Sequence, residues 1–189
     1  MKRLAGAIFT GALVVGGLVG MSAPAFAVTT FTTCSSVSGH ATLNPGISNT
    51  HQSSHVTGSA TISGCAGGGV TGGSLSFSGD TIPGDCNSLA NPTPGQVVIT
   101  GTFSINWTGP SPGTSSGSLK AKQTSNPVQV KAITKITSGK FAGTSSNPTK
   151  GKVLVQFTPD AGQNCTTTPI TGVSVQNVPN NKYVVASKT

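Results

Sequence analysis

The stretches VSGHATL (residues 37–43) and HVTGSATIS (residues 55–63) decide the fold of this chain. Paired antiparallel so that the two residue numbers sum to 99, they place every apolar or small residue on one face and the polar residues on the other. A half-buried sheet requires this alternation, and a slip of one residue would reverse it. The same register sets Cys34 opposite Cys65. The sequence therefore predicts a β-hairpin near the start of the fold.

Alternation with a period of two recurs along the rest of the chain, whereas apolar residues do not repeat at helical spacing. Turn signals rich in Pro, Gly and Asn separate about nine such segments, in the manner of a sandwich or barrel. We expect one all-β domain over residues 28–189, an immunoglobulin-like sandwich of two antiparallel sheets with about nine strands. The Pro-, Gly- and Ser-rich stretch at 108–118 is expected to be a long loop at one end of the sandwich.

The first residues have the pattern of an export signal. Lys2 and Arg3 precede an apolar run, and Ala25-Phe26-Ala27 supplies small residues at the positions that a signal peptidase reads. We therefore expect residues 1–27 to be a signal peptide that is cut after Ala27. No later apolar run is long enough to cross a bilayer, so the mature chain is expected to have no transmembrane segment and to be extracellular or associated with the cell envelope.

The mature chain is poor in core-forming residues, since 48 of its 162 residues are apolar. Its four cysteines suit disulfides in an oxidising compartment, where covalent bonds supplement a thin core. The hairpin register pairs Cys34 with Cys65, which leaves Cys86 for Cys165. A Cys65–Cys86 bond is a competing possibility because both residues flank one short strand.

Charge is divided unevenly along the chain. Residues 28–119 contain two aspartates and no Lys or Arg, whereas residues 120–189 contain nine lysines and one aspartate, so the two parts carry −2 and +8. Lys120 and Lys122 share one strand face, as do Lys150 and Lys152. The first interpretation is that these lysines keep the protein soluble and protect sheet edges from pairing. The other is a basic face that meets anionic cell-envelope polymers or lipid headgroups as partners.

The other titratable residues predict no catalytic or metal site. His40 and His55 are expected on the polar face of the hairpin, roughly 13 Å apart at the rise of a strand, and His51 in its loop. The aspartates lie in turns rich in Gly or Pro, where they favour local hydrogen bonding, and a disulfide between Cys86 and Cys165 would bring them near one bridge. These acids are Asp80, Asp85 and Asp160. We therefore expect a protein that is not an enzyme and binds no metal or cofactor. A weak calcium site at the aspartate oxygens is the alternative.

Nucleic acid is not expected as a partner. The mature chain has no arginine, and it has few aromatic rings on which bases could stack. Trp107 shares its strand phase with Phe103 and Ile105, which places it in the core rather than on a binding platform.

The run SGCAGGGVTGG (residues 63–73), with LNPGI upstream at residues 43–47, resembles a group of small secreted actinobacterial proteins of unknown function. The resemblance covers roughly residues 34–107 and fades in the lysine-bearing part. It implies export from a Gram-positive, high-GC bacterium and an all-β fold. It brings no catalytic or binding residue with it.

These observations predict a secreted, disulfide-stabilised binding or envelope-associated protein without enzymatic activity. One alternative is a carrier of a small ligand, or an inhibitor of a secreted enzyme that acts through loops such as 66–73 and 108–118. A second is a hydrolase that uses the aspartates. A deep pocket would favour the carrier, two converging carboxylates the hydrolase, and a flat surface with clustered lysines the envelope protein. The sequence predicts no oligomeric state.

Overall fold

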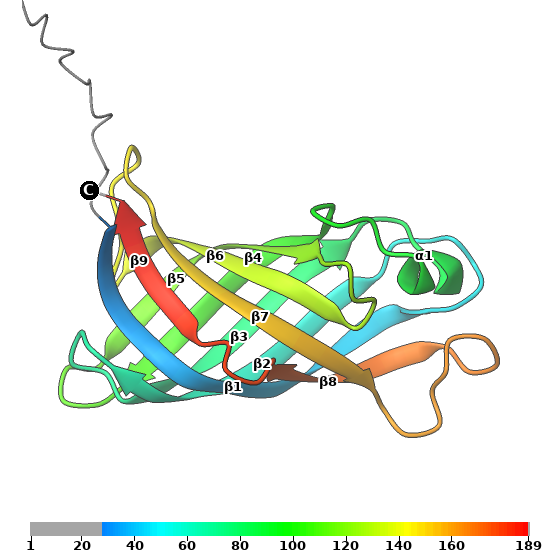
Figure 1. Cartoon of the computed structure of the whole chain (residues 1–189), viewed down its shortest axis with the longest axis horizontal. Helices are drawn as coiled ribbons and strands as arrows, with labels where there is room; N and C mark the ends of the chain where they lie inside the picture. Colours follow the sequence, from blue (N-terminus) through cyan, green and yellow to red (C-terminus); the bar gives the residue numbers. More distant parts are fainter. Residues whose placement is uncertain (1–27, 189) are drawn as a thin grey trace, which may run out of the picture.

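The computed structural model describes residues 28–188, which form one antiparallel sheet closed into a barrel (Figure 1). The predicted signal peptide lies outside these residues. Nine strands and one short helix follow each other along the chain: β1 (Val28–Ile47), β2 (His55–Ala66), β3 (Gly72–Thr81), α1 (Cys86–Ala90), β4 (Val97–Thr108), β5 (Gly113–Gln123), β6 (Gln129–Gly139), β7 (Thr149–Pro159), β8 (Ile170–Asn177) and β9 (Tyr183–Lys188).

The barrel closes through β1, the longest strand. One side of β1 pairs with β2, and its other side pairs with β9 over residues 28–34 and with β8 over residues 38–47. β7 likewise pairs with both β8 and β9. The two short strands therefore lie end to end and together fill the eighth position of an eight-stranded barrel.

Asn177 bridges the junction between β8 and β9. Its side-chain oxygen accepts a hydrogen bond from the Val37 amide at 3.0 Å, and its side-chain nitrogen donates to the Ser35 carbonyl at 3.0 Å. An amide side chain thus replaces the ladder partners that β1 lacks where one strand ends and the next begins. The barrel wall stays hydrogen-bonded across the break.

The prediction of an immunoglobulin-like sandwich was wrong, although the all-β class and the nine strands are confirmed. Successive strands pair from β1 to β8 and return to β1, so the sheet has no second, facing sheet. The expected long loop at 108–118 was also wrong in extent. Residues from Gly113 onward form the first half of β5, and the connection is limited to residues 109–112.

The predicted hairpin register is confirmed. Cys34 lies opposite Cys65, Val37 opposite Ile62 and Leu43 opposite Val56, as the alternation requires. Cys34 is bonded to Cys65, and Cys86 to Cys165. These are the pairs that the register predicted, and they fit an extracellular protein.

Large aromatic side chains fill one end of the barrel. The Trp107 ring meets Phe141 edge to face, with 5.5 Å between centroids, and stacks on Tyr183 at 6.5 Å. The indole Nε1 donates to Ser115 Oγ at 2.8 Å, so this buried polar atom is satisfied. Gly151 gives Tyr183 its space, because a Cβ there would lie 2.2 Å from the phenolic oxygen. We call this group, with Phe31, the aromatic plug.

Burial of Tyr183 predicts a loss of stability at high pH. Burial raises the pKa of its phenol from 10.0 to about 12, although a hydrogen bond with Thr134 opposes the shift. As the pH rises above about 10 the unfolded chain loses a proton that the folded chain keeps, so unfolding becomes easier. We expect the unfolding free energy to be unaffected by this group below about pH 10, and to fall by about 2–3 kcal/mol by pH 12.

Urea titrations at a series of alkaline pH values measure this change. Tyr183→Phe is the control, because it keeps the ring and removes the titrating group. The difference in unfolding free energy between the unmodified protein and Tyr183→Phe should narrow steadily above about pH 10. A difference that does not vary with pH would contradict the assignment.

Candidate functional site

The half of the barrel away from the aromatic plug encloses a cavity of about 380 Å³. Strand alternation turns every second side chain into the barrel, and in this half most of the inward residues are aliphatic or small. Ala121 on β5 lies directly opposite Ala132 on β6, so two methyl groups stand where larger side chains would fill the interior. Space remains at the centre because neighbouring strands contribute short side chains. The inner wall is lined by Val37, Ala41, Leu43, Val56, Leu75, Phe77, Leu119, Ala121, Val130, Ala132, Val153, Val155 and Val175.

One glycine shapes this wall. Gly58 on β2 lies opposite Phe77 on β3, and a Cβ at Gly58 would come within 2.5 Å of the Phe77 ring. The absent side chain lets the ring lie against the β2 backbone, beside the cavity rather than across it. Phe77 therefore forms part of the apolar wall.

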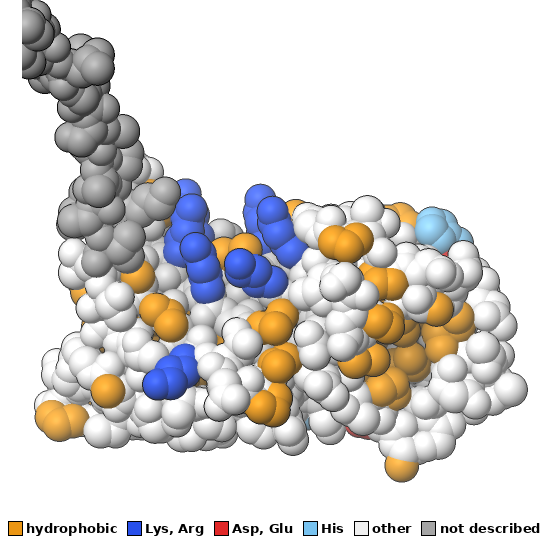
Figure 2. Space-filling model, in the orientation of Figure 1, with side chains coloured by type: hydrophobic (Ala, Val, Ile, Leu, Met, Phe, Trp, Pro, Cys, Tyr) orange, Lys and Arg blue, Asp and Glu red, His pale blue; other side chains and the backbone are white. Residues whose placement is uncertain are grey.

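The cavity opens at the end of the barrel that carries α1 (Figure 1). Figure 2 shows hydrophobic side chains lining a hollow at this end of the molecule. Two large hydrophobic residues near the opening, Ile82 and Val128, are each 37% exposed. Polar side chains contribute only at the rim. They are His51, Gln52, Thr81, Asp85, Ser88, Asn91, Thr93, Gln96 and Gln123.

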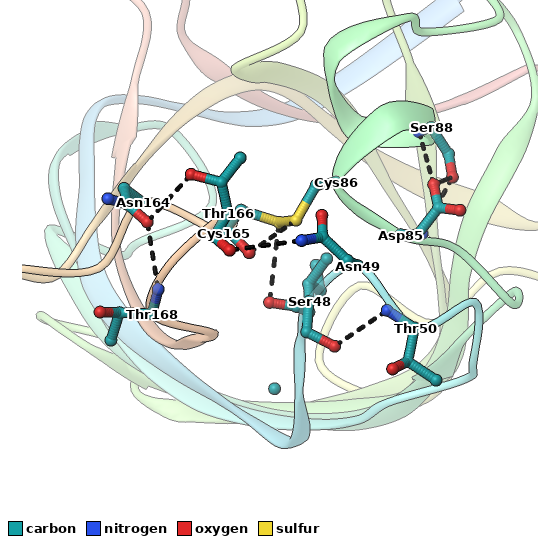
Figure 3. The surroundings of a disulfide bond; sticks show 12 residues. Ser48, Asn49, Thr50, Asp85, Cys86, Ser88, Asn164, Cys165, Thr166 and Thr168 are labelled. Atoms are coloured by element: carbon teal, nitrogen blue, oxygen red, sulfur yellow. Dashed lines mark hydrogen bonds between the residues drawn. A yellow bond between two sulfur atoms is a disulfide. The ribbon is translucent and has the colours of Figure 1, made fainter.

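The helix α1 is fixed across this opening by a disulfide and a cap (Figure 3). Cys86, its first residue, is bonded to Cys165 in the β7–β8 loop, and its amide donates to the Ser48 carbonyl at 3.0 Å. Asp85 caps the helix by accepting from the Ser88 amide at 2.8 Å, while Ser88 Oγ accepts from the Asp85 amide at 2.9 Å. Five residues are too few for a helix that is stable alone, so these bonds hold it.

The segment that leads into α1 is also joined to the β1–β2 loop. Gln52 and Gly84 exchange two backbone hydrogen bonds of 3.1 and 3.0 Å. His51 Nδ1 lies 3.5 Å from an Asp85 carboxylate oxygen. The hydrogen bonds from Ser88 hold the pKa of the Asp85 carboxyl below its usual value, and the proximity of His51 adds to this effect. Three loops thus meet around the opening.

The structure pairs each histidine with a different aspartate. His40 lies 3.0 Å from Asp160, and His55 lies 2.8 Å from Asp80 on the outer face of the barrel. Asp80 belongs to strand β3, not to the loop in which it was expected. The three acids are therefore held apart by separate partners rather than sharing one site, and among residues 28–188 no three His, Cys, Asp or Glu side chains form a metal-binding group.

The predicted basic residues all lie on the outer wall. Lys120 and Lys122 project from β5, and Lys150 and Lys152 from β7. β6 lies between these strands and adds two further lysines, Lys131 and Lys135, which sequence reasoning did not assign to this face. Their alternation with inward Ala132 and Thr134 is a signal that could have found them.

Sequence reasoning also missed the cavity. The two loops considered for ligand contact lie at the plugged end, where the Ser111 amide donates to the Gly69 carbonyl at 2.8 Å. The inward alanines on β1, β5 and β6 were the available signal, because small residues on the buried face of a sheet leave volume inside a barrel.

In comparisons with known proteins, no family model matches this chain, and neither the curated proteins nor the solved structures gave a significant match. Within residues 28–188 no helix has the length and hydrophobicity needed to cross a lipid bilayer.

Proposed function

We propose that this protein is an exported, non-enzymatic carrier that holds a small apolar ligand inside its barrel. The observation that carries the proposal is the open cavity of about 380 Å³ with an aliphatic wall. Its volume lies within the range of about 300–1,000 Å³ that is typical of small-molecule sites, and such sites are mostly apolar. The predicted signal peptide and the two disulfides support an extracellular setting.

The energetic cost of an empty cavity supports the same conclusion. Protein interiors are packed with few voids larger than a water molecule. In this open cavity the apolar side chains of the wall face water, and a bound apolar ligand would remove their surface from it, which favours binding. Water gains little by filling it, because the inner wall offers no hydrogen-bonding partners. An apolar ligand would replace this poorly bonded water.

The arrangement of the lining indicates the chemistry of the ligand. Aliphatic side chains surround its body, and the polar groups lie around the opening. A molecule with an apolar body and one polar end would place that end among His51, Gln52 and Gln123. The aromatic plug closes the other end, so such a ligand enters past α1.

Partly filling the cavity should weaken binding. Ala132→Phe places a ring in the space between β5, β6 and β7, and we expect it to weaken binding of the fluorescent probe phenylnaphthylamine by about tenfold or more, since the ring occupies space that the probe needs. Because the ring enters an existing space, the variant should remain folded. A fluorescence titration measures the affinity, and thermal unfolding with and without probe measures the linked stabilisation.

Thr102→Phe is the matched control. It adds the same ring on the outer face of β4, where Thr102 is exposed between Ser78 and Ser118. This variant should bind the probe as the unmodified protein does. Equal affinity in all three proteins would overturn the proposal, because the probe would then bind elsewhere.

A further inference from the structure

The outer wall formed by β5, β6 and β7 combines six lysines with apolar side chains. Ile133 on β6 lies directly between Lys120 on β5 and Lys152 on β7. Leu154 lies opposite Lys131, and Val184 on β9 lies opposite Lys152. Figure 2 shows lysine and hydrophobic side chains side by side on this side of the molecule. We call this surface the basic-apolar face; its members are Lys120, Lys122, Lys131, Ile133, Lys135, Lys150, Lys152, Leu154 and Val184.

The lysines on this face repel one another. Lys122 lies directly opposite Lys131, and Lys135 lies directly opposite Lys150. Like charges at facing positions of a sheet destabilise it. Among the described residues, the salt bridges all join a histidine to an aspartate, so no acid relieves this repulsion. The clustered lysines create a positive potential over this face, and an anionic partner would relieve their repulsion.

Protection of a sheet edge does not account for these lysines. β5, β6 and β7 each have a hydrogen-bonded neighbour on both sides, so none of them is an edge strand. Solubility alone does not account for the face either, because half-buried Ile133, Leu154 and Val184 occupy outward positions among the charges. The combination calls for a partner that is both anionic and apolar.

We propose that the basic-apolar face docks on an anionic lipid surface. Lysine ammonium groups would contact lipid phosphates, while the aliphatic side chains reach the boundary between headgroups and acyl chains. Three strands set about 4.8 Å apart present the six lysines within roughly 10 by 15 Å, a compact patch suited to a flat surface. A soluble anionic polymer of the envelope would satisfy the charges but would offer nothing to Ile133 and Leu154. The proposal does not depend on what the cavity binds.

Vesicle binding tests this proposal directly. The full mature protein is mixed with vesicles of phosphatidylglycerol and phosphatidylcholine, or of phosphatidylcholine alone, and the bound fraction is measured by sedimentation. We expect binding only to the anionic vesicles, and a marked loss of binding when the ionic strength is raised, because exposed charges are screened. Binding to both kinds of vesicle, or to neither, would overturn the proposal.

Two sets of substitutions separate the contribution of lysine charge to vesicle binding from that of apolar contact. Replacing Lys120, Lys122, Lys150 and Lys152 with Gln should reduce partitioning by roughly a hundredfold or more, at about fivefold for each lysine near an anionic membrane. Ile133→Thr with Leu154→Thr places a residue that favours strands at both positions and should reduce partitioning by roughly tenfold through lost apolar contact. Lys140→Gln is the control for a single charge, because Lys140 lies beyond the face and hydrogen-bonds Ser111 at 3.1 Å. It should bind like the unmodified protein, whereas Lys120→Gln should not.

A polymer partner would give a different pattern. If the Ile133 and Leu154 substitutions leave vesicle binding unchanged, and polyphosphate binds as tightly as the anionic vesicles, the face recognises charge alone and the lipid proposal fails. Circular dichroism and thermal unfolding confirm that each variant is folded. If the variant with four lysines replaced does not fold, two other results still test the lipid proposal. They are the salt dependence of the unmodified protein and the vesicle binding of the Ile133→Thr, Leu154→Thr double variant.

Discussion

Replacing Cys86 and Cys165 with alanine is expected to lower the unfolding free energy by about 3–5 kcal/mol and to weaken ligand binding at the same time. The bond links residues 79 positions apart, so its removal greatly enlarges the conformational freedom of the unfolded chain. It also fixes α1 to the β7–β8 loop across the mouth of the cavity. Without it, the five-residue helix loses its main attachment, and the bound probe should dissociate faster.

The other disulfide provides the matched control. Cys34 and Cys65 lie 31 positions apart on paired strands, near the aromatic plug rather than the mouth. Replacing both with alanine should lower the unfolding free energy by about 3–4 kcal/mol and leave probe affinity unchanged in the folded protein. Urea unfolding and stopped-flow probe dissociation measure both effects. If the Cys86/Cys165 variant retained the affinity and dissociation rate of the unmodified protein, α1 would have no role in retaining a ligand.

The hairpin could be predicted because its information is local. Within residues 37–43 and 55–63 the polar and apolar residues alternate without interruption, and only one register buries Val37, Leu43 and Ile62 together. The disulfide pairing then followed from the register. Strand positions along the rest of the chain were found for the same reason, since each strand has its own period of two.

Barrel closure could not be predicted because it depends on pairing between distant strands. Only residues 37–43 of β1 were recognised, whereas the strand spans Val28–Ile47 and contacts three others. Its first half is rich in Thr and Ser and carries Phe31 as its one large apolar residue before Cys34, so no alternation marks it. β8 and β9 share one position in the barrel, and no feature of either strand alone indicates this.

Two bulges limit what the alternation can predict. Val97 and Ile99 occupy alternate positions in the sequence, but the register with β5 shifts between these two residues. In β6 the alternation of apolar residues is interrupted at Ile133, whereas the register shift lies nearer the end of the strand, where Ser138 and Ile136 face consecutive residues of β5. Ile133 therefore points outward as a true exception to the alternation, and this exception contributes to the basic-apolar face. A periodic pattern identifies strands but does not separate a bulge from a functional surface residue.

Trp107→Ala is expected to lower the unfolding free energy by about 3–5 kcal/mol, which corresponds to a fall of roughly 10–15 °C in Tm for a domain of this size. Trp107 is only 3% exposed and contacts Phe141 and Tyr183 in the aromatic plug. Its removal leaves a void between the Phe141 and Tyr183 rings at this end of the barrel. It also removes the donor to Ser115 Oγ, which itself donates to the Lys140 carbonyl.

Trp107→Phe separates the contribution of ring packing from that of the hydrogen bond to Ser115 Oγ. A phenyl ring keeps most of the packing and loses the indole N–H, so this variant should lose about 1–2 kcal/mol, the cost of a smaller ring and one buried hydrogen bond. Thermal and urea unfolding measure both variants. Because the plug closes the end of the barrel opposite α1, Trp107→Phe should bind the probe as the unmodified protein does. A loss below about 1 kcal/mol in Trp107→Ala would mean that the plug contributes little to stability. The core would then have to derive its stability from the aliphatic wall around the cavity.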